Sequence, residues 1–135
     1  MTLLYIDTNI FIDFVKDRTN IYRKDISTPA TKLFFNTFSC KYHIIISTWT
    51  LNQIYKEVKT EDIAMLFNML NKKIIIENYD EKDKLEANQR STDNFEDALH
   101  IILAEKTKAD IIVTRNISHF IKIGTKIPIK RPEDV

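Results

Sequence analysis

Short apolar runs alternate along the chain with longer stretches of helical periodicity. Four runs are rich in β-branched residues and have the length of strands: Leu3 to Ile6, His43 to Ile46, Lys73 to Ile76 and Ile111 to Val113. A short final strand is expected around Ile127 to Ile129, ending at Pro132. Strands that alternate with helices are typical of a mostly parallel α/β sheet.

Two helices are predicted between the second and third strands. One carries Leu51, Ile54, Tyr55 and Val58, and the other carries Ile63, Leu66, Phe67 and Leu70. Both sets repeat at positions i, i+3, i+4 and i+7, so we expect both stripes to face the core. The segment from Asp80 to Gln89 has good helix formers, although the helical pattern around it is weak.

Composition favours one globular domain spanning residues 1–135, because 44% of the 135 residues are apolar. The net charge of +1 predicts neither a basic nucleic-acid binder nor an acidic solvating chain. Cys40 is the single cysteine, which excludes an internal disulfide and a cysteine metal motif. No run approaches the roughly 20 apolar residues of a membrane span. Asp7 interrupts the first apolar run too early for a signal peptide. We therefore expect a cytoplasmic protein that does not enter membranes.

Polar side chains follow three of the predicted strands. Asp7 comes directly after the first strand, Ser47 and Thr48 follow the second, and Thr114-Arg115-Asn116 follows the fourth. Because the carboxyl ends of parallel strands meet at one edge, we expect these groups to lie close together. The acidic segment 93–97 precedes an apolar helix at 98–104, and its acids reach the same edge only if that helix is long and tilted.

Helix capping offers a structural explanation for several of these residues. Asp7 could cap a helix starting near Asn9, and Asn116 or Ser118 could cap a helix after the fourth strand. Asp93 and Glu96 have the spacing of a capping box, and for these two residues we favour that interpretation. Capping does not explain Asp97, which lies four residues after Asp93, where like charges on a helix repel.

A cluster of Asp7, Glu96 and Asp97 would be costly without a cation. Two carboxylates about 4 Å apart repel by roughly 4 kcal/mol at an effective dielectric constant near 20. Carboxylate oxygens suit Mg²⁺ or Mn²⁺, whereas the lack of a His/Cys ligand group argues against structural zinc. The chemistry that such a site implies is metal-assisted phosphodiester hydrolysis.

The chain resembles PIN-domain ribonucleases over almost its whole length. The motifs that carry the resemblance are Tyr5 to Ile12 around Asp7, Glu96-Asp97-Ala98-Leu99-His100-Ile101, and Ala109 to Phe120. The resemblance implies a three-layer α/β/α fold with a mostly parallel sheet of about four to five strands. It also implies a Mg²⁺- or Mn²⁺-dependent ribonuclease. The Glu-Asp-Ala-Leu form is similar to that of short prokaryotic PIN proteins, which are often the toxins of toxin–antitoxin pairs.

The resemblance also assigns roles to individual residues. Asp7 and Asp97 would be direct metal ligands. Glu96 would bind a second metal ion or orient the attacking water. Thr114 and Asn116 would hold Asp7 and that water by hydrogen bonds.

One position departs from the family pattern in a way that bears on metal binding. Gln53 stands where the family usually has a glutamate, and an amide is a poorer Mg²⁺ ligand. Asn52 is an adjacent alternative, and we expect Glu57 to lie too far from the strand edge to substitute. His119 stands where an acid commonly precedes the phenylalanine.

Substrate contacts are harder to predict. Arg115 lies beside the site, and a basic rim follows the first helix; both could hold phosphates of a substrate. For each of these residues taken individually, however, we favour an ordinary ion-paired surface position. The rim consists of Lys16, Arg18, Arg23 and Lys24. Trp49 and Tyr55 could stack bases, although aromatic residues at helical spacing more often belong to the core. We interpret His100 and His119 as structural or substrate-side groups.

The resemblance implies three partners: an RNA substrate, a cognate antitoxin protein and a second copy of the chain in a homodimer. The helices at Ala30 to Phe38 and Thr50 to Val58 are candidate surfaces for the two proteins.

Two other functions fit the sequence. A PIN-like fold that has lost catalysis could serve as a binding module for RNA or protein, and Gln53 supports this alternative. A phosphatase with Asp7 as nucleophile is less favoured, because position 9 is asparagine and not a second aspartate.

Overall fold

The computed structural model describes residues 2–16, 42–70 and 73–135. Its strands are β1 (Thr2–Ile6), β2 (Tyr42–Ser47), β3 (Ile74–Glu77), β4 (Ile111–Val113) and β5 (Ile129–Lys130). Its α-helices are α1 (Thr8–Lys16), α3 (Thr48–Glu57), α4 (Thr60–Met69), α5 (Glu81–Arg90), α6 (Phe95–Lys106) and α7 (Ile117–Ile123), and a short 3₁₀ helix, η1 (Pro132–Asp134), follows. The strands and helices predicted within these ranges are present, with boundaries shifted by up to three residues.

The five strands form one parallel sheet in the order β3-β2-β1-β4-β5. β1 lies in the centre, with Leu4 opposite Ile44 of β2 on one side and Ile111 of β4 on the other. The prediction of a mostly parallel α/β/α architecture is confirmed.

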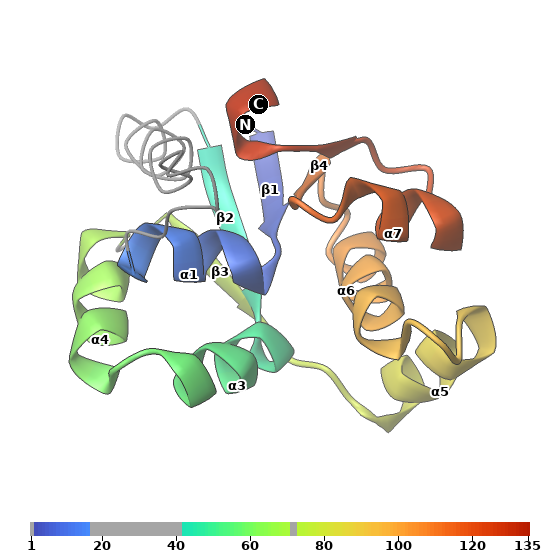
Figure 1. The fold of residues 1–135 in the computed structure, drawn as a ribbon, viewed down its shortest axis with the longest axis horizontal. Helices are drawn as coiled ribbons and strands as arrows, with labels where there is room; N and C mark the ends of the chain where they lie inside the picture. The colour runs from blue at the N-terminus through green and yellow to red at the C-terminus, as the bar shows by residue number, and fades with distance from the viewer. Residues whose placement is uncertain (1, 17–41, 71–72) are drawn as a thin grey trace, which may run out of the picture.

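The central strands are buried on both faces, and successive side chains of a strand point to opposite sides of the sheet. Leu4 and Ile6 pack with α1, α3 and α4 on one face, whereas Tyr5 packs with α5, α6 and α7 on the other. Ile44 and Ile46 of β2 join the first cluster and Ile45 joins the second. Figure 1 shows the two helical layers on either side of the strands.

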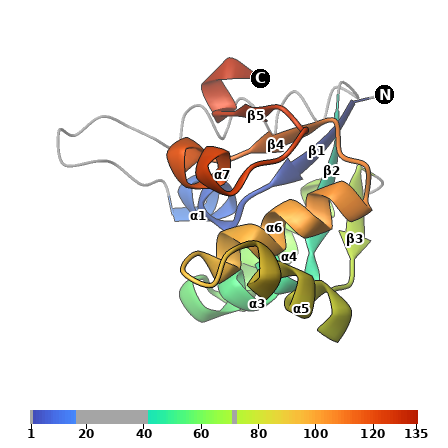
Figure 2. The same ribbon diagram turned by 90° about the vertical axis from the view of Figure 1, so that its right-hand side faces the viewer.

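α6 is the most buried helix that the structure describes, with every residue from Ala98 to Ala104 buried. It packs beside α5 and along the second face of the sheet (Figure 2). Because α6 runs back towards the start of β4, its N-terminus lies at the carboxyl edge of the strands. This placement brings the acidic segment before α6 to the same edge as Asp7.

The stripe predicted for α3 is wrong at Tyr55, which is 51% exposed. Ile54 and Val58 provide the core contact of this segment, and Tyr55 lies about 100° around the helix from Ile54. Ile63 and Leu70 are buried as predicted. The side chains of Leu66 and Lys16 lie outside the described part of the chain.

Several other predictions fall on segments that the structure does not describe. These are the ones for Arg18, Arg23, Lys24, Cys40 and the helix at 30–38. None of the helices in the described ranges has the length and apolar character needed to cross a membrane.

Candidate active site

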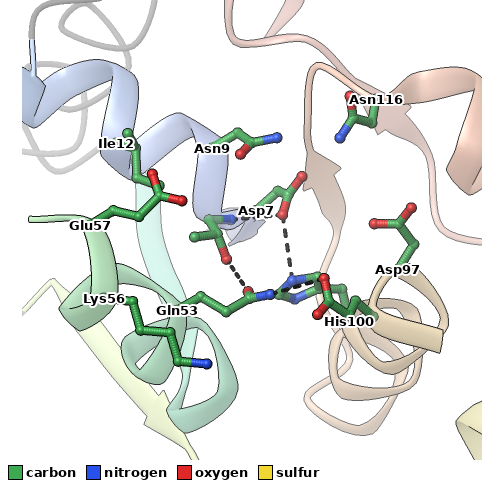
Figure 3. Close-up of a pocket in the computed structure, with 11 residues that line it drawn as sticks. Asp7, Asn9, Ile12, Gln53, Lys56, Glu57, Asp97, His100 and Asn116 are labelled. Carbon is green, nitrogen blue, oxygen red and sulfur yellow. Dashed lines mark hydrogen bonds and ion pairs between the residues drawn. The ribbon is translucent and has the colours of Figure 1, made fainter. Parts of the chain in front are cut away.

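A pocket of about 330 Å³ opens at the carboxyl edge of the sheet. Its lining comes from the start of α1, the exposed side of α3, the N-terminal half of α6 and the turn before α7 (Figure 3). The lining residues are Asp7, Thr8, Asn9, Ile12, Gln53, Lys56, Glu57, Glu96, Asp97, His100 and Asn116. The three acids predicted as metal ligands therefore share one pocket.

Asp7 is 4% exposed and held by hydrogen bonds to both carboxylate oxygens. Its Oδ1 accepts from the Thr8 N–H at 2.7 Å, and its Oδ2 accepts from the Thr114 hydroxyl at 2.8 Å. Asp7 does precede a helix, as the capping interpretation proposed, but its side chain binds the first helical N–H. An ordinary N-cap binds the second or third. Asp7 therefore makes no ordinary N-cap hydrogen bond in the described structure, and it lines the pocket.

Thr114 links Asp7 to the turn before α7. Its Oγ1 also accepts from the Asn116 N–H at 3.0 Å, so one hydroxyl fixes both the carboxylate and the turn. Asn116 is the N-cap residue of α7, but its side chain makes no capping hydrogen bond and lines the pocket.

The predicted capping box of Asp93 and Glu96 is wrong. The N-cap residue of α6 is Asn94, which makes no side-chain capping bond, and its N–H donates to the Ser91 hydroxyl at 3.1 Å. The helix therefore begins at Phe95, and Glu96 is its second residue, one position short of the capping box. Glu96 instead faces the pocket.

Gln53 connects α1 and α6 across the pocket. Its Oε1 accepts from the Thr8 hydroxyl at 2.5 Å, and its Nε2 donates weakly to Oε2 of Glu96 at 3.5 Å. The carboxylate of Glu96 decides this orientation of the amide, because a flipped amide would place two oxygens together. A glutamate was the residue expected at position 53. The glutamine found there carries no charge, and its amide binds Glu96.

Two pocket residues on α3 were missed by the sequence reasoning. Lys56 and Glu57 lie three and four residues after Gln53 and line the same pocket. Glu57 therefore lines the pocket, and the expectation that it lies too far from the strand edge to substitute as a metal ligand stays a prediction. The spacing i, i+3, i+4 from Gln53 was the available signal, since such positions share one face of a helix. Asn52 lies outside the pocket lining, and its Nδ2 donates to the Tyr79 hydroxyl at 3.3 Å.

Two residues considered as substrate contacts, Arg115 and Trp49, are bound to other side chains of the protein. Arg115 bonds through Nε to Asp13 at 2.9 Å and through Nη1 to Glu133 at 3.3 Å, so the ion-paired interpretation is confirmed. Trp49 packs edge-to-face against Tyr79 and Phe95, with ring centroids 5.5 and 6.1 Å away. It is thus part of an aromatic cluster.

Asp97 is partly buried on the opposite side of the pocket from α3 (Figure 3). Burial and the nearby negative charge of Asp7 raise the pKa of its carboxyl group. Nδ1 of His119, which is 56% exposed, lies 3.4 Å from Oδ2 of Asp97. Burial is the main cause of this shift, and the nearby His100 and His119 oppose it.

The donor set of the pocket fits a hard divalent cation. Within the residues that the structure describes, no three His, Cys, Asp or Glu side chains are close enough together to form a metal site by themselves. Mg²⁺ does not need such a cage, because it commonly binds one or two carboxylates and keeps several waters. Asp7 and Asp97 would be those carboxylates, and a bound cation would compensate the negative charge of Asp7 that, after burial, raises the pKa of Asp97.

Asp97→Asn should stabilise the metal-free protein at neutral pH. A carboxyl group with a raised pKa in the folded state destabilises the fold when ionised, and this cost disappears as the pH falls through that pKa towards the ordinary value of 3.8. The thermal midpoint of the variant in EDTA should therefore exceed that of the native protein at pH 7. The difference should shrink towards pH 4. A lower thermal midpoint for the variant than for the native protein at pH 7 would show that ionised Asp97 does not destabilise the fold.

Sequence comparison finds no match to a family model or to a curated protein. The solved structures with a similar fold include the following three. VapBC2 from Rickettsia felis, bound to a DNA fragment from its promoter, has a TM-score of 0.62 and 17% identity over 96% of this chain and 98% of that chain. VapBC-1 from nontypeable Haemophilus influenzae has a TM-score of 0.61 and 16% identity over 97% and 98%. VapC20 from Mycobacterium tuberculosis, a toxin that cleaves the sarcin–ricin loop, has a TM-score of 0.60 and 13% identity over 86% and 93%. At these identities the likeness establishes the fold, and the PIN-like fold predicted from the sequence motifs is confirmed.

Proposed function

We propose that this PIN-like chain is a Mg²⁺- or Mn²⁺-dependent endoribonuclease and the toxin of a toxin–antitoxin pair. The observation that carries the proposal is the meeting of Asp7, Glu96 and Asp97, from the ends of β1 and α6, in one open pocket. The fold shared with a toxin that cleaves the sarcin–ricin loop supports RNA as the substrate.

Each residue has a role that its contacts support. A divalent ion bound in the pocket would supply Lewis acidity for water activation and compensate charge on the phosphodiester. Asp7, held by Thr8 and Thr114, and Asp97 would be its ligands. Glu96, held by Gln53, would orient the attacking water or hold a second ion, and Asn116 would position water or phosphate with its uncommitted amide.

Among the described residues that line this pocket, Lys56 is the one lysine or arginine, and we assign it to the phosphate backbone of the RNA. Lys56→Gln should raise KM for a short RNA several-fold with little change in kcat, since a rim charge contributes to binding more than to the reaction. The matched control is Lys59→Gln, an exposed lysine that does not line the pocket. Equal KM values for Lys56→Gln and the native protein would remove Lys56 from the substrate site.

A partner and a dimer belong to the same proposal. The resemblance to toxin-like PIN proteins supports inhibition by a small antitoxin that covers the pocket, and the exposed Tyr55 of α3 offers a contact for it. Light scattering of the purified chain, alone and with the product of an adjacent gene, measures both associations. A monomer that binds no such product would contradict this part of the proposal.

Cleavage of a pool of structured RNAs tests the central activity. The purified chain should cut RNA with Mn²⁺ or Mg²⁺, stop in EDTA and recover when metal is restored. Asp97→Asn, purified in parallel, controls for contaminating ribonuclease and should be inactive. Intact RNA in every lane, with no bound metal, would favour a binding module of the same fold with Gln53 as the lost ligand.

A further inference from the structure

His100 is a buried group of the pocket that the roles above do not use. It lies on α6, three residues after Asp97, and is 2% exposed. Its Nε2 lies 3.5 Å from Oδ1 of Asp7, and its Nδ1 is 2.8 Å from the hydroxyl of Tyr5 (Figure 3 shows the first contact). Each ring nitrogen therefore faces a defined partner.

The partner behind the ring is itself fixed. Tyr5 lies in β1 with no exposed surface, and its hydroxyl is 3.0 Å from Oγ of Ser47. Ser47 caps α3 by accepting from the Thr50 N–H at 3.0 Å, so it cannot move without opening that helix. Burial raises the pKa of Tyr5, which keeps the hydroxyl protonated.

The hydrogen-bonding capacity of these groups places a hydrogen on one nitrogen of the His100 ring. The ionised carboxylate of Asp7 can only accept, so Nε2 of His100 carries a hydrogen. Nδ1 faces the Tyr5 hydroxyl, which donates to Oγ of Ser47, and the Ser47 hydroxyl donates to Oγ1 of Thr50 at 3.1 Å. Both ring nitrogens of His100 therefore have a fixed polar partner.

We infer that Tyr5 and His100 are a positioning pair that holds the Asp7 carboxylate in its metal-binding orientation. The inference rests on the proposed function for the role of Asp7. A carboxylate has about four acceptor positions. The Thr8 N–H and the Thr114 hydroxyl occupy two of them, and Nε2 of His100 lies beside Oδ1 at 3.5 Å, which leaves the remaining positions for a ligand in the pocket. Groups that orient metal ligands from behind commonly change affinity by about 10- to 100-fold when removed.

The tautomer of His100 tests the pair without metal or activity. In ¹⁵N NMR spectra of the metal-free chain, the His100 ring should carry a hydrogen on Nε2. Tyr5→Phe removes the polar partner of Nδ1 and should change the Nδ1 shift. A ring with hydrogen on Nδ1 alone, or shifts unaltered in Tyr5→Phe, would overturn the inference even if the protein is a ribonuclease.

Two substitutions of His100 separate positioning from packing. Glutamine places an amide nitrogen near the position of Nε2 and can still donate to Asp7, whereas asparagine places it near Nδ1 and cannot. Both lose the ring, so urea unfolding should show similar losses of stability. Mn²⁺ affinity by calorimetry should fall by about 10-fold or more in His100→Asn and recover largely in His100→Gln. Equal affinities in the two variants would contradict positioning. A native protein that binds no Mn²⁺ would instead contradict the proposed function. The ¹⁵N NMR measurement of the His100 ring would in that case still test the arrangement of Tyr5 and His100.

Discussion

Asp7→Asn should lower the rate of metal-dependent RNA cleavage by more than about 100-fold, the upper end of the loss caused by removing groups that merely support metal ligands. The amide has one oxygen and no charge, so it loses attraction for the cation. The fold should survive, because the remaining oxygen can accept from the Thr8 N–H or the Thr114 hydroxyl.

The measurement is single-turnover cleavage of a short RNA at saturating Mn²⁺, with circular dichroism to verify the fold. Asp93→Asn is the matched control, since it makes the same chemical change at an exposed position outside the pocket. Asp93→Asn should cleave at the native rate. Equal rates for Asp7→Asn and the native protein would show that Asp7 is not a ligand.

Phe120→Ala should have the largest effect on stability, about 3–5 kcal/mol, because it removes a fully buried aromatic ring and leaves a cavity. Phe120 packs α7 against the second core cluster, next to the turn that carries Asn116. Ile121→Ala on the same helix is the control, since Ile121 is 64% exposed and should change stability by less than about 0.5 kcal/mol.

Urea unfolding of the two variants measures the difference. If Phe120→Ala unfolds at the same urea concentration as Ile121→Ala, α7 is not anchored through this ring. The turn between Thr114 and Asn116 would then need another source of rigidity.

The sheet was predictable because its central strands are buried on both faces. Runs such as Ile44 to Ile46 and Ile111 to Val113 are apolar throughout, which is the pattern of central parallel strands. The position of Asp7 at the end of β1 followed directly. The exposure of Tyr55 did not, since a helical stripe does not define how wide a face the neighbouring elements cover.

The acids of α6 show where local sequence rules fail. Asp93 and Glu96 match a capping box, but the Ser91 hydroxyl binds the Asn94 N–H and the helix starts one residue later. That shift places Glu96 in the pocket. It depends on a loop contact that periodicity does not encode.

Contacts between distant segments were equally invisible to the sequence. Lys56 and Glu57 belong to the pocket only because α3 packs against α1 across the edge of the sheet. His100 was interpreted as a structural or substrate-side group. Only the fold places it between Asp7 and Tyr5, since His100 and Tyr5 are 95 residues apart in the sequence.

The position of bound Mn²⁺ tests the assignment of the pocket most directly. Crystals of the full chain soaked in Mn²⁺ and measured at the manganese absorption edge should show an anomalous peak within about 2.5 Å of oxygens of Asp7 and Asp97. The peak should be missing in Asp97→Asn crystals treated identically. A peak elsewhere on the protein, or an empty pocket at saturating Mn²⁺, would contradict a metal-dependent site at this edge of the sheet.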